Sequence, residues 1–189
     1  VLAEILSDFR QQYPRVSYRF YSGNADHIKE RIENGTLDIG LLPEPVDIAR
    51  YEFLRVPVME EWGVLTREDS PLTALEVVRP QDLVGRPLMV SGRELVQNEL
   101  ANWLGDDAQR LNILIRYNLL YNIAMLVKSG FGDALCIRLD CVYPGLRFIP
   151  LSPPLRLGSV LVWKKQQITS PAVGALIAHT KQYLKSISD

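Results

Sequence analysis

Residues 21–45 read YSGNADHIKERIENGTLDIGLLPEP, and this stretch decides how the rest of the chain is interpreted. An alternating apolar run ends at Tyr21, a helical pattern fills residues 26–33, and a second apolar run occupies residues 37–42. The three segments together predict one β-α-β unit.

Three small or polar residues, Ser22, Gly23 and Asn24, lie where the first strand meets the helix. In open parallel sheets ligands bind at this edge, because the start of a helix offers unpaired N–H groups to an anion. The same side chains can instead do no more than cap the helix. The cluster therefore has two interpretations, half of a small-molecule cleft or a simple cap.

The composition is that of a globular chain without obvious nucleic-acid or metal chemistry. Of the 189 residues, 47% are hydrophobic and the formal net charge is -1, so there is no basic surplus for a phosphate backbone. The two cysteines and two histidines lack zinc-site spacing, and Cys136 is expected to be a reduced core residue of a strand. No apolar run reaches ~20 residues and no export leader precedes Val1, which predicts a cytoplasmic protein without membrane contact. We expect no cofactor and no metal.

Strand and helix patterns alternate along the whole chain. Strands are expected at residues 16–21, 37–42, 61–67, 88–90, 111–116, 134–137, 146–151 and 158–163. Helices are expected at residues 1–13, 26–33, 94–104 and 119–128, and from Ser170 onward. This alternation predicts an α/β fold with a mostly parallel sheet, divided into two lobes. The two strands that would cross between the lobes carry Thr66 and Trp163, which are the candidate hinge residues.

A second set of polar turns precedes the later helices. Ser91, Gly92 and Arg93 follow one strand, and Asn118, a possible helix cap, follows the next. Hydroxyls, backbone N–H groups and a guanidinium suit a carboxylate or another small anion. As alternatives, Arg93 can be a surface residue paired with a neighbouring carboxylate, and Tyr121 can be lobe core instead of cleft lining.

The order of several short motifs resembles that of the effector-binding domain of LysR-type transcriptional regulators. The matching motifs are, in chain order, Phe9 with Tyr13-Pro14-Arg15-Val16, Gly23, Gly35-Thr36-Leu37-Asp38-Ile39-Gly40, Asp69-Ser70-Pro71-Leu72, Gln81-Asp82-Leu83, Val127-Lys128-Ser129-Gly130-Phe131-Gly132 and residues 170–177. The resemblance implies two Rossmann-like lobes joined by two crossover strands, as in type 2 periplasmic solute-binding proteins. Lobe I would comprise residues 1–63 and 162–189, and lobe II residues 64–161.

The resemblance also implies the function, which is sensing of a small, anionic effector between the lobes. The expected effector-binding residues are Ser22, Gly23, Asn24, Ser91, Gly92, Arg93, Asn118 and Tyr121. The family's helix-turn-helix domain and the first strand of lobe I are absent from this chain, so promoter DNA is an expected partner through that domain alone.

Self-association is the other partner that the resemblance implies, as a homodimer and as a tetramer in the full-length protein. Pairing through the first helix places Leu2, Ile5, Leu6 and Phe9 at the dimer interface. The apolar pattern alone would make these four residues intramolecular core.

Two other function classes are weighed against the sensor. A solute-binding protein of an uptake system has the same fold, and the sequence upstream of this chain distinguishes the two. An enzyme is disfavoured, because the chain has no G-x-S-x-G, Walker, HExxH or paired-cysteine motif. Neither His27 nor His179 has a nucleophile or carboxylate partner at motif spacing.

Overall fold

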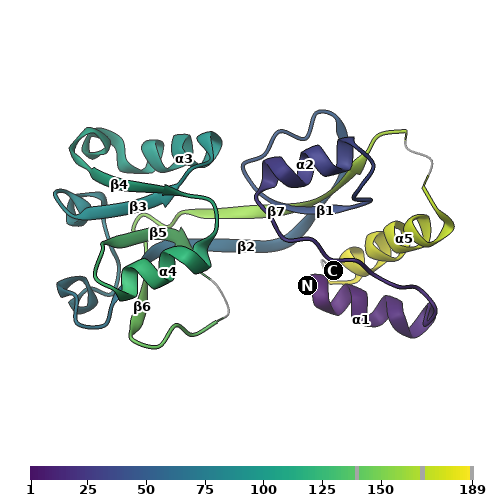
Figure 1. Ribbon diagram of the computed structural model, residues 1–189, viewed down its shortest axis with the longest axis horizontal. Coiled ribbons are helices and arrows are strands. Elements are labelled where there is room, and N and C mark those ends of the chain that lie inside the picture. Colours follow the sequence, from purple (N-terminus) through teal and green to yellow (C-terminus); the bar gives the residue numbers. More distant parts are fainter. Residues whose placement is uncertain (139–140, 167–168, 188–189) are drawn as a thin grey trace. The chain divides into compact units, whose positions relative to one another are not determined.

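The computed structural model describes residues 1–138, 141–166 and 169–187, and the chain forms two compact α/β units (Figure 1). Unit 1 consists of Val1–Met59 and Gly158–Asp189, and unit 2 consists of Glu60–Leu157. The chain therefore passes between the units twice, and the α/β class expected from the sequence is confirmed.

Unit 1 is built from three helices, a short strand and parts of two long strands. Its elements are α1 (Leu2–Gln12), α2 (Ala25–Glu33), β1 (Gly40–Pro43), the first part of β2 (Tyr51–Arg67), most of β7 (Arg156–Lys164) and α5 (Pro171–Ser186). β1 pairs antiparallel with β7, with Leu41 opposite Leu161.

The two faces of this sheet carry different helices. Leu42, Val160 and Val162 are fully buried in a cluster that includes residues of α2. Because side chains alternate along a strand, Leu41 and Leu161 face the other way. That second face is the side of α1 and α5, which contact each other.

Unit 2 is a mixed sheet with one helix on each face. Its elements are the rest of β2, β3 (Pro87–Ser91), α3 (Glu94–Leu104), β4 (Asn112–Tyr117), α4 (Leu120–Lys128), β5 (Asp133–Ile137) and β6 (Leu146–Pro150), with 3-10 turns at Pro71–Ala74, Pro80–Leu83 and Gly105–Arg110. β3 lies between β4 and β5 and is parallel to both. β2 lies between β5 and β6 and is antiparallel to both.

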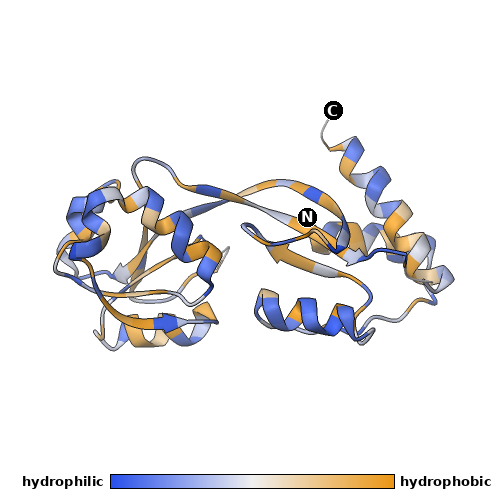
Figure 2. Cartoon of the chain, turned by 90° about the horizontal axis from the view of Figure 1, so that it is seen from above, coloured by the Kyte–Doolittle hydropathy of each residue, from blue (hydrophilic) through white to orange (hydrophobic). Residues whose placement is uncertain are grey.

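The helices of unit 2 are held by two separate cores. α3 packs on a cluster that contains Leu88, Val90 and Leu135, whereas α4 packs on a cluster that contains Met89 and Cys136. Neighbouring strand residues thus serve opposite faces, as the two-residue period of a strand requires. The helices alternate apolar and polar residues along their length (Figure 2), which fits helices that bury one face.

Three sequence expectations about strands are wrong. Residues 16–21 form no strand, because none of the described segments pairs with them and a strand needs a hydrogen-bonded partner. β1 begins at Gly40 and not at residue 37. β1 with β7, β2 with β5 and β2 with β6 are antiparallel, and β3 is parallel to β4 and β5, so the sheet is mixed instead of mostly parallel.

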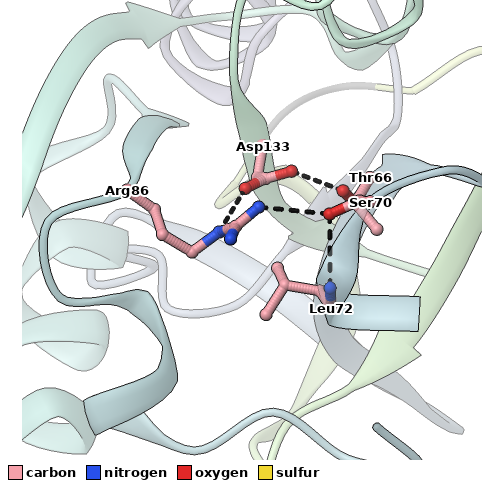
Figure 3. A network of polar contacts seen from close by, with 5 residues as sticks. All are labelled: Thr66, Ser70, Leu72, Arg86 and Asp133. Atoms are coloured by element: carbon pink, nitrogen blue, oxygen red, sulfur yellow. Dashed lines mark hydrogen bonds and ion pairs between the residues drawn. The ribbon is translucent and has the colours of Figure 1, made fainter. Parts of the chain in front are cut away.

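A buried polar network joins the amino-terminal part of unit 2's sheet to a turn (Figure 3). Asp133, at the start of β5, accepts a hydrogen bond from the Thr66 hydroxyl and pairs with Arg86 Nε at 2.7 Å. Arg86 Nη2 also donates to Ser70 Oγ at 3.1 Å, and Ser70 Oγ accepts from the Leu72 N–H at 3.3 Å. The Asp133 side chain is 7% exposed, so this carboxylate depends on these partners in place of water.

We expect the Asp133→Ala substitution to lower the free energy of unfolding by about 3 kcal/mol, because it leaves the Arg86 charge half-buried and unpaired. Urea denaturation followed by circular dichroism measures the change. The matched control is Asp69→Ala, which removes the exposed Asp69–Arg67 pair and should cost much less. Equal stability of the two variants would show that the network does not hold unit 2 together.

Candidate functional site

The candidate site in unit 2 lies at the carboxyl ends of two adjacent parallel strands. Ser91 ends β3 directly opposite Tyr117, which ends β4. The Gly92 N–H donates to the Tyr117 carbonyl at 2.7 Å, so the pairing continues into the turn. The structure therefore brings together two turns that the sequence placed 25 or more residues apart, those containing Ser91 to Arg93 and Asn118.

The first turn leads directly into α3. Ser91 Oγ accepts a hydrogen bond from the Arg93 N–H at 3.3 Å, which closes the turn. Arg93 is the N-cap residue of α3, and its side chain makes no capping hydrogen bond. A guanidinium has no acceptor atom, so it cannot satisfy the N–H groups at the start of the helix.

The second turn leads into α4, and the start of this helix also has no side-chain cap. The N-cap residue is Leu119, which has no side-chain acceptor, and Asn118 lies one residue earlier and is exposed. The expectation that Asn118 caps this helix is therefore wrong. By contrast, α2 and α5 have side-chain caps, from Asn24 and Ser170.

Two helix N-termini without side-chain caps thus follow neighbouring strands at one edge of unit 2. Each N-terminus presents backbone N–H groups and the positive end of a helix dipole. Hydroxyl, amide and guanidinium groups of Ser91, Asn118 and Arg93 belong to the same turns. An arrangement of donors around one edge can bind a carboxylate or another small anion.

The two tyrosines near these turns have different environments. The Tyr117 hydroxyl donates to the Leu135 carbonyl at 2.7 Å, and burial raises the pKa of Tyr117 far above its ordinary value. Tyr117 is therefore a structural residue of the α4 core. Tyr121, on the first turn of α4, is 66% exposed, so the alternative that it is core is wrong and its side chain is accessible to a ligand.

The polar cluster of unit 1 does act as a helix cap. Asn24 Oδ1 accepts a hydrogen bond from the His27 N–H at 2.9 Å, whereas Ser22 is exposed. Arg31 stacks over the ring of Tyr21, the residue before this turn, at 4.0 Å from the ring centroid. An effector-binding role for Ser22, Gly23 and Asn24 stays a prediction.

The candidate hinge residues make structural contacts. Thr66 is fully buried in the network with Asp133, and Trp163 is buried with its Nε1 donating to Glu52 Oε2 at 3.2 Å. Neither contact tests whether the residue acts as a hinge.

The candidate dimer residues divide into two kinds. Ile5 and Phe9 are buried inside unit 1, and Phe9 stacks on Tyr13 with 4.5 Å between ring centroids. Leu2 and Leu6 are half-buried and line a cavity of unit 1. The buried pair belongs to the intramolecular core, and an interface role for the helix stays a prediction.

Sequence reasoning missed the Asp133–Arg86 pair. The signal was a single acidic residue at the start of the apolar run at residues 134–137, which is unusual for a buried strand. Cys136 is confirmed as a core residue of a strand, since it is buried in β5, and this burial raises the pKa of its thiol to about 12. Among the described residues no His, Cys, Asp or Glu cluster could hold a metal, and no described helix is long and apolar enough to cross a membrane.

Comparisons with known proteins agree on one family. The family model for the LysR substrate binding domain matches residues 1–185. The HTH-type transcriptional regulator YwbI of Bacillus subtilis (strain 168), described as uncharacterized, is 23% identical over 187 residues, covering 95% of this chain and 61% of YwbI. The transcriptional activator CmpR of Synechocystis sp. (strain ATCC 27184 / PCC 6803 / Kazusa) is 27% identical over 135 residues, covering 68% of this chain and 42% of CmpR. The chain thus spans less than two thirds of the length of these relatives.

Solved structures show the same fold. The effector-binding domain of QuiR in complex with shikimate has a TM-score of 0.84 at 17% identity, covering 98% of this chain and 91% of that one. The BenM effector-binding domain with its effector benzoate has a TM-score of 0.73 at 16% identity, covering 99% of this chain and 87% of the BenM chain. The matched family consists of transcriptional regulators, which confirms the expectation that the chain is not an enzyme. The chain belongs to the family of LysR substrate-binding domains, the effector-binding part of LysR-type transcriptional regulators.

Proposed function

We propose that this chain senses a small anionic metabolite, a carboxylate in the first instance, for a LysR-type transcriptional regulator. The observation that carries the proposal is the pair of uncapped helix N-termini, of α3 and α4, at adjacent carboxyl ends of β3 and β4. Ser91, Gly92, Arg93 and Asn118 would supply the main contacts, and Tyr121 would lie beside the ligand.

The chemistry of an anion fits this edge better than that of a neutral ligand. The groups on the two turns are mainly donors: backbone N–H groups, a hydroxyl, an amide and a guanidinium. Hydrogen bonds from such donors to an ionised acceptor are about twice as strong as neutral ones. Shikimate and benzoate, the compounds bound in the QuiR and BenM domains, are both ring carboxylates at neutral pH, which supports the same class here.

We also propose, from the family resemblance, that Ser22, Gly23 and Asn24 of unit 1 would contact the effector. Binding would then favour one arrangement of the two units over another, with Thr66 and Trp163 on the strands that bend. A ligand shifts such an equilibrium by no more than its difference in affinity for the two states. A coupling of about 1–3 kcal/mol is typical of allosteric proteins and would change DNA-binding behaviour measurably.

The proposed partners follow from the family. We propose a cytoplasmic homodimer that uses the α1 side of unit 1, a tetramer in the full-length protein, and promoter DNA bound through a helix-turn-helix domain outside this chain. The alternative is a solute-binding protein of an uptake system with the same fold. The family match and the regulators among the relatives favour the first.

We expect Ser91→Ala and Arg93→Ala to abolish the ligand-induced rise in Tm while leaving the Tm of the free protein nearly unchanged. The physical reason is that each substitution removes a donor from the turn without emptying the core. Differential scanning fluorimetry with a panel of carboxylates, amino acids and inorganic anions identifies the stabilising ligand first.

The matched control is Ser129→Ala, in the turn at the opposite, carboxyl end of α4. A rise in Tm that is the same in Ser91→Ala, Arg93→Ala and the parent protein would remove these two residues from the site.

We further propose that the first strand of lobe I, absent from this chain, occupies a cavity of unit 1. The cavity measures ≈ 650 Å³ and is lined by residues 16–21 on one side and residues 37–41 on the other. Leu161 of β7, Leu2 of α1 and Val173 of α5 also line it. Both bordering segments have strand-like sequences, and residues 16–21 have no pairing partner among the described segments.

The position of the helices supports a strand at this place. Leu2, at the start of α1, lines the cavity, so a segment joined to Val1 would begin there. From such a strand the chain would cross through α1 to residues 16–21, and from there it would cross back through α2 to β1. Both crossovers are expected to be right-handed, and they run in opposite directions across the sheet. They therefore require α1 and α2 on opposite faces, which is where they lie.

We expect that adding the natural upstream segment of about ten residues, enough for one strand, protects the amides of residues 16–21 from hydrogen exchange. Pairing to a neighbouring strand is the reason for the protection. Mass spectrometry on peptides from the longer and the shorter chain makes the comparison, with peptides from β3 and β5 as the internal control. Equal exchange of residues 16–21 in both chains would contradict the proposed strand.

A further inference from the structure

Tyr117, the last residue of β4, makes two hydrogen bonds that hold separate parts of unit 2. Its carbonyl accepts a hydrogen bond from the Gly92 N–H at 2.7 Å, and its hydroxyl donates one to the Leu135 carbonyl at 2.7 Å. Gly92 belongs to the turn between β3 and α3, and Leu135 lies within β5. One residue therefore connects the end of β4 both to that turn and to β5.

The bond to Leu135 lies where β3 and β5 are no longer paired. Among the described residues, β3 pairs with β5 as far as Met89 opposite Ala134, whereas its pairing with β4 continues to Ser91 opposite Tyr117. Because β3 lies between β4 and β5, the Tyr117 side chain spans two strand spacings, roughly 10 Å. The phenol thus ties β4 to β5 beyond the last paired residues of β3 and β5.

The surroundings of this phenol keep it a hydrogen-bond donor. Tyr117 packs in the core beneath α4, in the cluster that contains Met89 and Cys136. Burial raises the pKa of Tyr117 far above its ordinary value, so the hydroxyl keeps its proton throughout the physiological pH range. Leu135 is fully buried, and a buried carbonyl that loses its donor is costly. The bond therefore holds the Tyr117 side chain in one place.

The bond to Gly92 depends on close approach of the turn to β4. A methyl group at Gly92 would lie 3.3 Å from the Tyr117 carbonyl oxygen and 3.8 Å from Arg116 Cβ. The first distance is shorter than most contacts of such a group, so a larger residue would push the turn away from β4. The turn that carries Ser91 and Arg93 is therefore held directly against the end of β4.

We infer that Tyr117 is a positioning residue of the effector site proposed for unit 2: its carbonyl fixes the turn that precedes α3, and its phenol fixes the strand end that precedes Asn118 and α4. The inference rests on the proposed function, because it concerns that same site. Tyr117 acts through the two turns and not by contact with the ligand. Donors that are held in place before a ligand arrives lower the cost of binding, so the Tyr117 hydroxyl contributes to affinity.

The first test measures the turns without a ligand. Tyr117→Phe removes the hydroxyl and keeps the ring, and amide hydrogen exchange of the 1–189 chain is followed in ¹H–¹⁵N spectra. We expect the Gly92 amide to exchange about fivefold faster relative to the amide of Met89, inside β3, because a looser end of β4 holds the turn less well.

The matched control for this test is Val127→Ala. Val127 is fully buried in the same core, in the last turn of α4 and so away from the turns that precede the helices. The substitution opens a space in the core and lowers the Tm, but it should leave the ratio of Gly92 to Met89 exchange rates unchanged. The control thus separates positioning of the turn from a general loss of stability.

The second test asks whether positioning changes affinity. Benzoate and inorganic phosphate are titrated into the parent chain, with the amides of Ser91, Gly92, Arg93 and Asn118 as the signals. For a probe that shifts these signals, Tyr117→Phe should weaken binding about fivefold, the size expected for one lost hydrogen bond, whereas Val127→Ala should bind as the parent does.

The outcomes of the two tests decide separate points. An unchanged ratio of Gly92 to Met89 exchange in Tyr117→Phe overturns the inference, and so does an equal change in Val127→Ala or an affinity of Tyr117→Phe equal to that of the parent. If neither probe shifts the turns of the parent chain, the proposed anion site fails for these probes. The exchange ratio alone then decides whether Tyr117 positions the turns.

Discussion

The parallel pairing of β3 with β4 is the constraint on which the candidate effector site depends. Adjacent parallel strands end at the same edge of a sheet, and each of these strands is followed by a helix. The hydrogen bond from Gly92 to the Tyr117 carbonyl extends the pairing by one more residue, so the two helix starts are held in register. Backbone geometry, and not the long side chains, therefore sets the spacing of the donors.

The opposite edge of the same sheet is held by charge. Arg86 precedes β3 and Asp133 begins β5, and β3 and β5 are parallel neighbours, so their ion pair joins the amino-terminal ends of the two strands. Thr66 connects this pair to β2. The sheet is thus fixed by buried polar groups at one edge, and the starts of α3 and α4, which lack side-chain caps, lie at the other.

Local patterns in the sequence predicted most of the elements, and tertiary context decided the rest. α3 begins and ends at the expected residues, because its apolar spacing, its polar start and the glycine after it agree. Residues 16–21 alternate as a strand should, yet no strand forms, because pairing depends on a partner that a local pattern does not contain. Asn118 was expected to cap α4 on residue type alone, but the helix begins one residue later than a cap at that position requires. The Asp133–Arg86 pair joins residues 47 positions apart, which no local pattern reveals.

Capping and anion binding compete for the same backbone groups, and this competition distinguishes the turns of the two units. At the start of α2 the Asn24 side chain already accepts from the His27 N–H, so one N–H of that helix is no longer open to a ligand. Any contact from Asn24 to an anion would have to come from its amide NH₂, which is a donor and is not used by the cap. At the starts of α3 and α4 the N-cap side chains leave the backbone groups for other acceptors. In the proposed site, the turns of unit 2 would therefore contribute most of the anion affinity, because the starts of α3 and α4 have no side-chain caps.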